Sequence, residues 1–203
     1  YQLYNQIEIP LLNVLGDMEE QGITVDTEFL AKMSIELGTA EQEAQQMVFD
    51  LAGEEFNVAS PKQLGEVLFD KMKLVEKPKK TKTGQYATGE EILNQLAKEH
   101  DICAKILEFR ELKKLKSTYV DAIPKLVDEH SRVHTDYSQT TAATGRLSSN
   151  NPNLQNIPIR TEKGRAIRKA FIPRNEEYTL LSADYSQVEL RIMADFADDK
   201  SMI

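Results

Sequence analysis

The stretch Ser182-Ala-Asp-Tyr-Ser-Gln-Val-Glu-Leu-Arg191 follows a short apolar run, Tyr178-Thr-Leu-Leu181. The apolar run is typical of a buried strand, so we expect Asp184 where that strand ends and the backbone turns. Ser186 and Glu189 have capping-box spacing, which predicts a helix that starts directly after Ser186. A carboxylate in this position suits Mg²⁺, which takes one or two protein carboxylates plus water and substrate phosphates. From the spacing alone, a turn residue beside a helix cap is the more common explanation, because short motifs have many false positives.

The chain has 203 residues, 40% apolar and 29% charged, which is typical of a soluble protein with one large or two small domains. It contains no run of 18 apolar residues and opens with no secretory leader, so we expect neither a membrane span nor export. The single Cys103 cannot form an internal disulfide and fits a reducing cytoplasm. The three histidines lack the spacing of a metal site.

The charge of the chain is unevenly distributed. The net charge is −8, yet residues 1–70 hold 2 basic and 14 acidic residues, whereas residues 71–203 hold 23 basic and 19 acidic ones. Residues 140–174 hold seven Lys and Arg against Glu162 alone. Phosphate binding depends on a local basic field rather than on the global sum, so the second part of the chain can bind nucleic acid. A plain solvated face would show the same charge run.

The first half of the chain is dominated by helical patterns. Apolar residues recur at helical spacing over residues 4–18, interrupted by Pro10, and Gly22 ends that pattern. Ile23 to Val25 is short and extended. Asp26 is placed to cap a long helix that runs toward Gly53.

Three more helices are predicted before residue 124. Ser60-Pro-Lys-Gln63 combines an N-cap, Pro at the first position and a capping-box partner, which predicts a helix to about Met72. Thr88-Gly-Glu-Glu91 predicts the cap of the next helix. Asp101 starts a last one, which ends before Pro124. Its predicted buried stripe is Ile102, Ile106, Phe109, Leu112, Leu115 and Tyr119.

Two groups of cations are candidates for contact with a nucleic-acid backbone. Residues 76–89 are basic, contain Pro and Gly and lack an apolar period, which predicts a mobile loop carrying Lys79, Lys80 and Lys82. The second group lies on the helix after Asp101 and comprises Arg110, Lys113, Lys114 and Lys116. Lys and Arg supply a sequence-independent attraction to phosphates. A solubilising face explains the same residues equally well.

Residues 144–160 are dense in Asn, Ser, Gln and Pro, which predicts an ordered but irregular segment. The minor groove presents acceptors that do not distinguish A·T from T·A, so donors placed there can test pair shape while largely ignoring sequence. The segment's candidate donors are Arg146, Asn153, Gln155 and Asn156. The amides can instead cap turns around Pro152 and Pro158, and different amides can do different jobs. Ala170 to Ile172 and Tyr178 to Ala183 are strand candidates.

Four stretches resemble the family A DNA polymerases, the bacterial DNA polymerase I group, in the family's order and at about its spacing. Residues 182–191 resemble the first catalytic motif of that family. The other matches are Tyr4–Ile23, Lys114-Leu-Lys-Ser-Thr-Tyr119 and Thr144–Arg160. The resemblance covers the whole chain.

The resemblance implies an α+β fold, in which a helical thumb is joined to part of an antiparallel-sheet palm. Residues 27–130 correspond to the thumb, with its tip loop at 76–89, and residues 1–26 and 131–203 to parts of the palm. The implied activity is that of a DNA-directed DNA polymerase, which transfers dNTPs to a primer 3′ end in DNA replication and repair. The implied partners are primer-template DNA and dNTPs, bound by a monomer in the bacterial cytoplasm at the nucleoid.

The resemblance also implies roles for single residues. Asp184 would bridge two Mg²⁺ ions that clamp the attacking and leaving oxygens, with the backbone carbonyl of Tyr185 as a further ligand. Glu189 would exclude a ribose 2′-OH, because a carboxylate packed against C2′ leaves no space for a hydroxyl. Arg160 would lie near the incoming nucleotide or the primer end. Gln187 would support the primer side, and the Lys114–Tyr119 motif adds Ser117 and Thr118 to the DNA-binding set.

The resemblance further implies a second carboxylate in a later His-Asp-Glu turn and a later nucleotide-binding helix. Neither pattern occurs before Ile203, and the chain opens without Met. We therefore expect a truncated portion of a polymerase that is inactive by itself. Two alternatives remain: a non-catalytic duplex-DNA-binding fragment, and a relative of the single-subunit RNA polymerases. Glu189, as a sugar gate, argues against the second.

Overall fold

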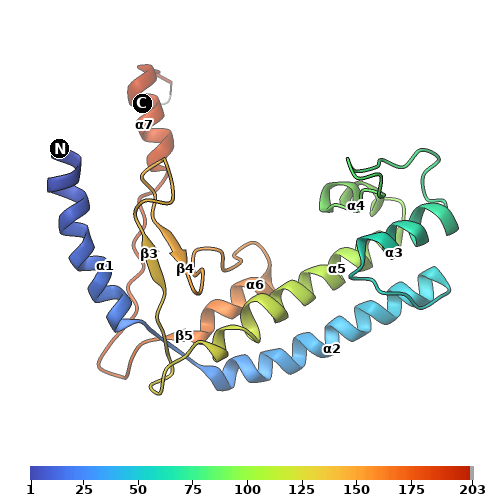
Figure 1. The fold of residues 1–203 in the computed structure, drawn as a ribbon, viewed down its shortest axis with the longest axis horizontal. Helices are drawn as coiled ribbons and strands as arrows, with labels where there is room; N and C mark the ends of the chain where they lie inside the picture. The colour runs from blue at the N-terminus through green and yellow to red at the C-terminus, as the bar shows by residue number, and fades with distance from the viewer. Residues whose placement is uncertain (202–203) are drawn as a thin grey trace. The chain divides into compact units, whose positions relative to one another are not determined.

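A computed structural model describes residues 1–201 of the chain (Figure 1). The described residues form two parts, residues 1–172 and residues 173–201. Its helices and short antiparallel strands confirm the predicted α+β class. Within residues 1–201, no helix is long and apolar enough to cross a bilayer.

The chain begins with a π-helical turn, η1 (Tyr4–Glu8), that continues into α1 (Ile9–Gln21). The regular helix starts next to Pro10, which has no N–H to donate and is therefore tolerated in a first turn. Gly22 ends α1 with φ of 58° and ψ of −169°, a backbone conformation open essentially to glycine alone. Both predicted features of this helix, the interruption and the stop, are confirmed.

A three-stranded antiparallel sheet follows α1. Strand β1 (Ile23–Val25) lies at its centre, between β2 (Arg132–Val133) and β5 (Phe171–Ile172). The sheet therefore joins the start, the middle and the end of residues 1–172. The predicted strands at 23–25 and 170–172 are confirmed within a residue.

A separate two-stranded ribbon pairs β3 (Asp136–Ser138) with β4 (Ser148–Asn150), as Figure 1 shows. The chain leaves β4 through a cis peptide bond between Asn151 and Pro152. The segment after it has no regular structure until α6 (Glu162–Ile167), whose N-cap Thr161 accepts a hydrogen bond from the Gly164 amide at 3.1 Å. The irregular character predicted for this region is confirmed, except for the short strand β4.

The long helix α2 (Thr27–Ala52) starts and ends where the sequence predicts. Oδ1 of Asp26 accepts a hydrogen bond from the Phe29 amide at 2.8 Å, and Gly53 closes the helix in the left-handed conformation. Helix α2 packs along α5 (Asp101–Leu115), and the two run side by side in Figure 1.

Helix α3 (Pro61–Gly65) and the π-helical η2 (Glu66–Lys71) form the third predicted helix. Oγ of Ser60 accepts from the Gln63 amide at 3.4 Å, as expected of a cap. The side chain of Gln63 does not complete a capping box, because its Oε1 accepts from the Asn57 amide at 2.8 Å instead.

The predicted cap of α4 (Glu90–Leu96) is wrong. Gly89 is the N-cap, and no side chain caps this helix. Thr88 is 7% exposed, and its hydroxyl and carbonyl oxygens both accept hydrogen bonds from Arg110. A half-buried guanidinium needs acceptors more strongly than an exposed helix end does, so the tertiary contact displaces the local one.

Helix α5 carries the buried stripe that the sequence predicts. The stripe continues through the π-helical η3 (Lys116–Val120), and all six predicted residues are at most 7% exposed. Cys103 lies in the same core, where burial raises the pKa of its thiol to about 11. The core that holds α2 to α5 is thus the one expected from helical spacing.

The second part of the chain differs from the prediction. Tyr178 to Ala183 forms no strand, and Leu181 is 90% exposed. A strand needs a partner for its backbone groups, and no described residue pairs with this segment. Helix α7 (Val188–Ala197) follows, with Gln187 rather than Ser186 at the N-cap position and no side-chain cap.

Candidate nucleic-acid interface

Arg110 is held inside the first part of the chain. Its Nη1 donates to the Thr88 carbonyl at 2.5 Å and its Nη2 to the Thr88 hydroxyl at 3.3 Å. Burial lowers the pKa of this guanidinium, which remains charged because arginine titrates far above neutral pH. Arg110 therefore ties α5 to the start of α4 and presents only part of its charge to solvent.

Two further cations of the predicted set, unlike Arg110, form ion pairs within the chain. Nζ of Lys113 lies 3.2 Å from Oε1 of Glu41, on α2. Nζ of Lys116 lies 2.6 Å from Oδ2 of Asp121 and donates to the Ser34 hydroxyl at 3.0 Å. Burial opposes the charge on Asp121, but hydrogen bonds from Lys116 and Ser34 outweigh it and lower the pKa of that carboxyl.

A groove of about 1230 Å³ lies between two walls that are distant in the sequence. One wall is formed by α4, α5 and η3, and the other by residues 155–161. Six predicted site residues line it: Arg110, Lys114, Thr118, Gln155, Asn156 and Arg160. Arg168 adds a cation, and three glutamates offset part of the positive charge. The structure therefore brings the Lys114–Tyr119 motif, at the end of α5 and in η3, next to the segment 155–161. Ser117 does not line this groove, and its hydroxyl donates to the Lys113 carbonyl at 2.7 Å.

The amides of the segment do different jobs. Oδ1 of Asn153 accepts from the backbone amides of Gln155 and Asn156, at 3.0 and 3.2 Å, which is a turn-forming role. Nε2 of Gln155 donates to the Leu147 carbonyl at 3.1 Å. The Asn156 and Arg146 side chains are exposed. The turn interpretation therefore holds for Asn153. Gln155 instead ties the segment to residue 147, and Asn156 and Arg146 remain candidates for DNA contact.

The backbone carbonyls of this segment are bound by side chains from other elements. The Tyr119 hydroxyl donates to the Asn156 carbonyl at 2.6 Å, and Nη2 of Arg168 donates to the Ile157 carbonyl at 3.3 Å. Nη1 of Arg165 donates to the carbonyls of residues 159 and 160. The segment is irregular, but these bonds fix its path.

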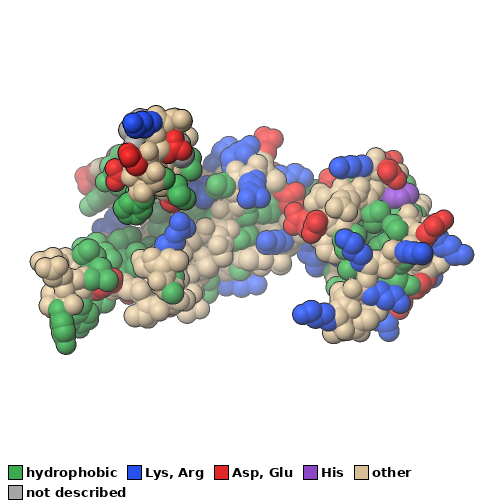
Figure 2. Space-filling model, turned by 90° about the horizontal axis from the view of Figure 1, so that it is seen from above, with side chains coloured by type: hydrophobic (Ala, Val, Ile, Leu, Met, Phe, Trp, Pro, Cys, Tyr) green, Lys and Arg blue, Asp and Glu red, His purple; other side chains and the backbone are tan. Residues whose placement is uncertain are grey.

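The basic loop forms a small hairpin. The Thr81 amide donates to the Gln85 carbonyl at 2.7 Å, and the Ala87 amide donates to the Lys79 carbonyl at 2.9 Å. Nζ of Lys80 lies 5.0 Å from the ring centroid of Tyr86, whose hydroxyl donates to Asp70. Lys79 and Lys82 are exposed. Figure 2 shows Lys and Arg side chains in blue at the end of the first part that contains α3 and α4.

Of the predicted catalytic residues, Arg160 lies in the first part of the chain, and Asp184 and Glu189 lie in the second. Asp184, Tyr185, Gln187 and Glu189 are all exposed. Nε of Arg191 donates to the Ser186 carbonyl at 3.0 Å and so links α7 to the turn before it. Residues 1–201 contain no group of three His, Cys, Asp or Glu able to hold a metal ion. Asp184 is thus a single exposed carboxylate that belongs to no such group among the described residues.

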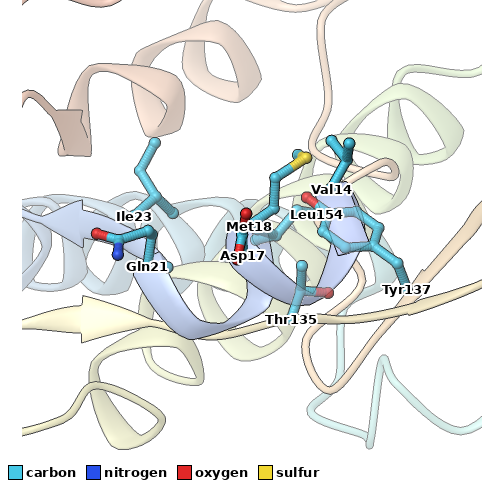
Figure 3. Close-up of a pocket in the computed structure, with 9 residues that line it drawn as sticks. Val14, Asp17, Met18, Gln21, Ile23, Thr135, Tyr137 and Leu154 are labelled. Carbon is cyan, nitrogen blue, oxygen red and sulfur yellow. The ribbon is translucent and has the colours of Figure 1, made fainter. Parts of the chain in front are cut away.

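A separate apolar pocket of about 470 Å³ lies beside the end of α1 (Figure 3). Its lining includes Met18, Ile23, Tyr137 and Leu154. None of the predicted site residues lines it. It is therefore distinct from the groove between α5 and the Asn-rich segment.

Comparison with known proteins decides the family. The sequence pattern of DNA polymerase family A matches residues 27–203. This chain belongs to DNA polymerase family A. The resemblance recognised from four short motifs is thereby confirmed.

The chain aligns in full with much longer family A relatives. It is 50% identical over 202 residues to DNA polymerase I of Deinococcus radiodurans, covering 99% of this chain and 21% of that protein. It is 47% identical to DNA polymerase I of Bacillus subtilis, covering 100% of this chain and 23% of that protein. The chain thus spans about a fifth of the length of these relatives.

A solved family A structure has the same fold. It is described as the POL domain of Pol1 from M. smegmatis in complex with DNA primer-template and dNTP. The TM-score is 0.90 at 42% identity, and the match covers 100% of this chain and 35% of that one.

Sequence reasoning missed several groups that shape the site. Thr88 anchors Arg110, and Tyr119, Arg165 and Arg168 bind the carbonyls of the segment. Tyr119 carried one available signal, because a hydroxyl at the last position of an apolar stripe needs a partner. The arginines gave no such signal, because an exposed Arg is ordinary on any surface.

Proposed function

We propose that this family A chain is the thumb and first palm portion of a DNA-directed DNA polymerase, which transfers dNTPs to a primer 3′ end in bacterial replication and repair. Within this proposal, residues 27–130 are the thumb, and residues 1–26 and 131–203 contribute to the palm. The protein would act as a monomer on primer-template DNA in the cytoplasm. The observation that carries the proposal is the groove, in which the motif of α5 and the segment 155–161 face each other.

The groove has the donors that sequence-independent duplex binding needs. Lys114 and Thr118 line the α5 wall and can bind phosphates, which supply most of the affinity for any duplex. Asn156 and Arg160 line the other wall. An amide donor at the minor-groove edge can bond the acceptor of either base, so it does not distinguish A·T from T·A. The two walls together can hold a duplex without reading its sequence.

Three predicted cations contribute to DNA binding less directly than the sequence suggests. Arg110, Lys113 and Lys116 are each bound to a group of the chain itself. Such cations still add to the local positive field, because a paired charge at a surface is only partly neutralised. Their contacts also link α5 and η3 to neighbouring groups of the chain. Lys114 forms no ion pair among residues 1–201 and is the strongest phosphate-binding candidate of the four.

The proposed metal site is built around the Asp184 carboxylate. A divalent cation would be bound by the Asp184 carboxylate and the Tyr185 carbonyl, and Mg²⁺ fits because it prefers oxygen ligands and accepts few from the protein. Bound there, the metal would stabilise the charge of the reacting oxygens. One carboxylate does not hold two ions, so the proposed site needs a second carboxylate, which the resemblance implies in a later His-Asp-Glu turn. This chain by itself is therefore expected to bind DNA without extending a primer.

The proposal is tested by substituting Asp184 in the complete polymerase. Asp184→Ala should reduce primer extension by several orders of magnitude, because catalysis loses a metal ligand. Duplex affinity should stay within about twofold, because the groove is intact. Asp195→Ala, an exposed carboxylate on α7, serves as the control and should leave both quantities unchanged. Extension by Asp184→Ala at the wild-type rate would reject Asp184 as a metal ligand.

A further inference from the structure

The Tyr119 hydroxyl joins the two walls of the groove. The Tyr119 ring is the last member of the buried stripe of α5 and η3 and is 7% exposed. Tyr119 nevertheless lines the groove, and its hydroxyl donates to the Asn156 carbonyl at 2.6 Å. A residue of the thumb core thus makes direct contact with the backbone that carries a candidate DNA-binding amide.

The hydroxyl is not needed to fill the core. A phenylalanine ring would occupy the same stripe position, and the other five members of that stripe are Ile, Leu or Phe. A buried phenol is costly unless it finds an acceptor, so the bond to Asn156 is what makes tyrosine suitable here. The acceptor gains as well, because segment 155–161 has no regular secondary structure to satisfy its carbonyl groups.

The bond from Tyr119 joins the segment where its backbone is also held on both sides. The backbone N–H of Asn156 donates to Oδ1 of Asn153, and the next carbonyl, that of Ile157, accepts from Arg168. The Ile157 side chain is 9% exposed and belongs to the core. Asn156 therefore has a fixed backbone and an exposed side chain, the arrangement expected of a group that must present an amide at a set place.

We propose that the Tyr119 hydroxyl is a positioning group, which sets the distance between the Asn156 amide and the Lys114 and Thr118 side chains on the opposite wall. This inference rests on the proposed function, because it assumes that both walls contact the same duplex. Lys114 and Thr118 lie on the same continuous helical stretch as Tyr119. A bond from Tyr119 to the segment therefore fixes the segment relative to Lys114 and Thr118.

The first test measures position without DNA. In Tyr119→Phe, amide hydrogen exchange in peptides covering residues 153–158 should become faster, while exchange in α5 stays unchanged, because the ring still fills the core. Tyr86→Phe is the matched control: it removes a partly buried phenol whose hydroxyl donates to Asp70 outside the groove, and it should leave exchange in 153–158 unchanged. Unchanged exchange in Tyr119→Phe overturns the proposal, whatever DNA binding shows.

The second test is a double-mutant cycle on DNA affinity in the complete polymerase. Tyr119→Phe should weaken primer-template binding by about threefold to tenfold, the range that one hydrogen bond supports. Because Tyr119 acts through Asn156, the loss should disappear in an Asn156→Ala background. Losses that add independently overturn the positioning role.

The two tests separate failure of this inference from failure of the proposed function. If Asn156→Ala weakens DNA binding but Tyr119→Phe does not, the segment contacts DNA and the positioning role is wrong. If neither substitution changes affinity although exchange rises in Tyr119→Phe, the proposed DNA contact of the segment is wrong, and a positioning role toward DNA is rejected with it.

Discussion

Nε2 of His134 lies 3.2 Å from Oδ2 of Asp128, in the turn before β2. On its other side, Nδ1 of the same ring lies 2.7 Å from the Glu19 carbonyl in α1. Both partners are acceptors, so both ring nitrogens can donate only when the imidazole is protonated. The ring therefore holds α1 to the β-sheet most firmly as a cation.

The stability of this contact should depend on pH. The hydrogen bonds to Glu19 and Asp128 raise the pKa of His134 above 6.5, and they outweigh the opposing effects of desolvation and of the Arg132 charge. A raised folded-state pKa adds stability that is complete below 6.5 and is lost as the pH rises through the folded value. The melting temperature should therefore fall between pH 6 and pH 8, and His134→Gln should remove that dependence. His130→Gln, a more exposed histidine nearby, should keep it.

Asp128 should limit stability on the acid side. Hydrogen bonds from the Arg132 amide and from His134 lower the pKa of this carboxyl to about 2. Its contribution is present above 3.8 and is lost as the pH falls toward 2. Asp128→Asn should therefore melt with a weaker pH dependence between pH 4 and pH 2 than the wild type. Identical acid profiles for the two proteins would contradict the assignment.

Two glycines around α1 should respond oppositely to alanine. A Cβ on Gly22 would lie 2.7 Å from the Val133 carbonyl oxygen and 2.8 Å from Nδ1 of His134, and its φ of 58° is unfavourable for alanine. Gly22→Ala should cost about 2–3 kcal/mol of unfolding free energy. Gly16 is helical with nothing within 4 Å, so Gly16→Ala should stabilise by about 0.5–1 kcal/mol. Urea denaturation measures both, and equal effects would contradict the close approach at Gly22.

Contact of the hairpin lysines with DNA can be tested through the salt dependence of duplex affinity. Lys79→Glu, Lys80→Glu and Lys82→Glu should each make the plot of log affinity for duplex DNA against log salt less steep, by about one unit per lost phosphate contact. Lys80 should matter least, because its ammonium lies over the Tyr86 ring. Lys105→Glu changes the charge equally on α5, where Lys105 pairs with Glu108, and is the control. A wild-type slope in all three variants would mean that the hairpin does not touch DNA.

The helices were predictable because their signals are local. Asp26 and Gly53 fix α2 through contacts within a few residues, and the stripe of α5 repeats at helical spacing. The strand at 178–181 was wrongly predicted because an apolar run does not reveal whether a partner strand exists. Thr88 was wrongly assigned for a related reason: Arg110, 22 residues later, binds the oxygens that a cap would use.

The sequence indicates candidate site residues one by one, but it does not show which of them share a surface. Motif resemblance indicated Lys114 and Asn156, yet only the fold places both on one groove. Sequence spacing also could not tell which cations are occupied by partners of the chain, as Lys113 is by Glu41, 72 residues away. Long-range contacts of this kind decide which members of a basic motif are available to DNA.

Glu189 carries the prediction that separates the DNA polymerase proposal from a relation to RNA polymerases. It lies in the first turn of α7, and its side chain is exposed. If its carboxylate occupies the space that a ribose 2′-OH would need, Glu189→Ala in the complete polymerase should raise incorporation of ribonucleotides by at least tenfold, with a much smaller change for deoxynucleotides. Single-nucleotide extension with each sugar measures the ratio. Glu189→Gln preserves side-chain volume and should retain most of the discrimination if exclusion is steric, whereas a loss as large as in alanine would assign the effect to charge. Unchanged sugar selectivity in Glu189→Ala would remove the gate assignment, and a wild-type preference for ribonucleotides would favour the RNA polymerase relationship.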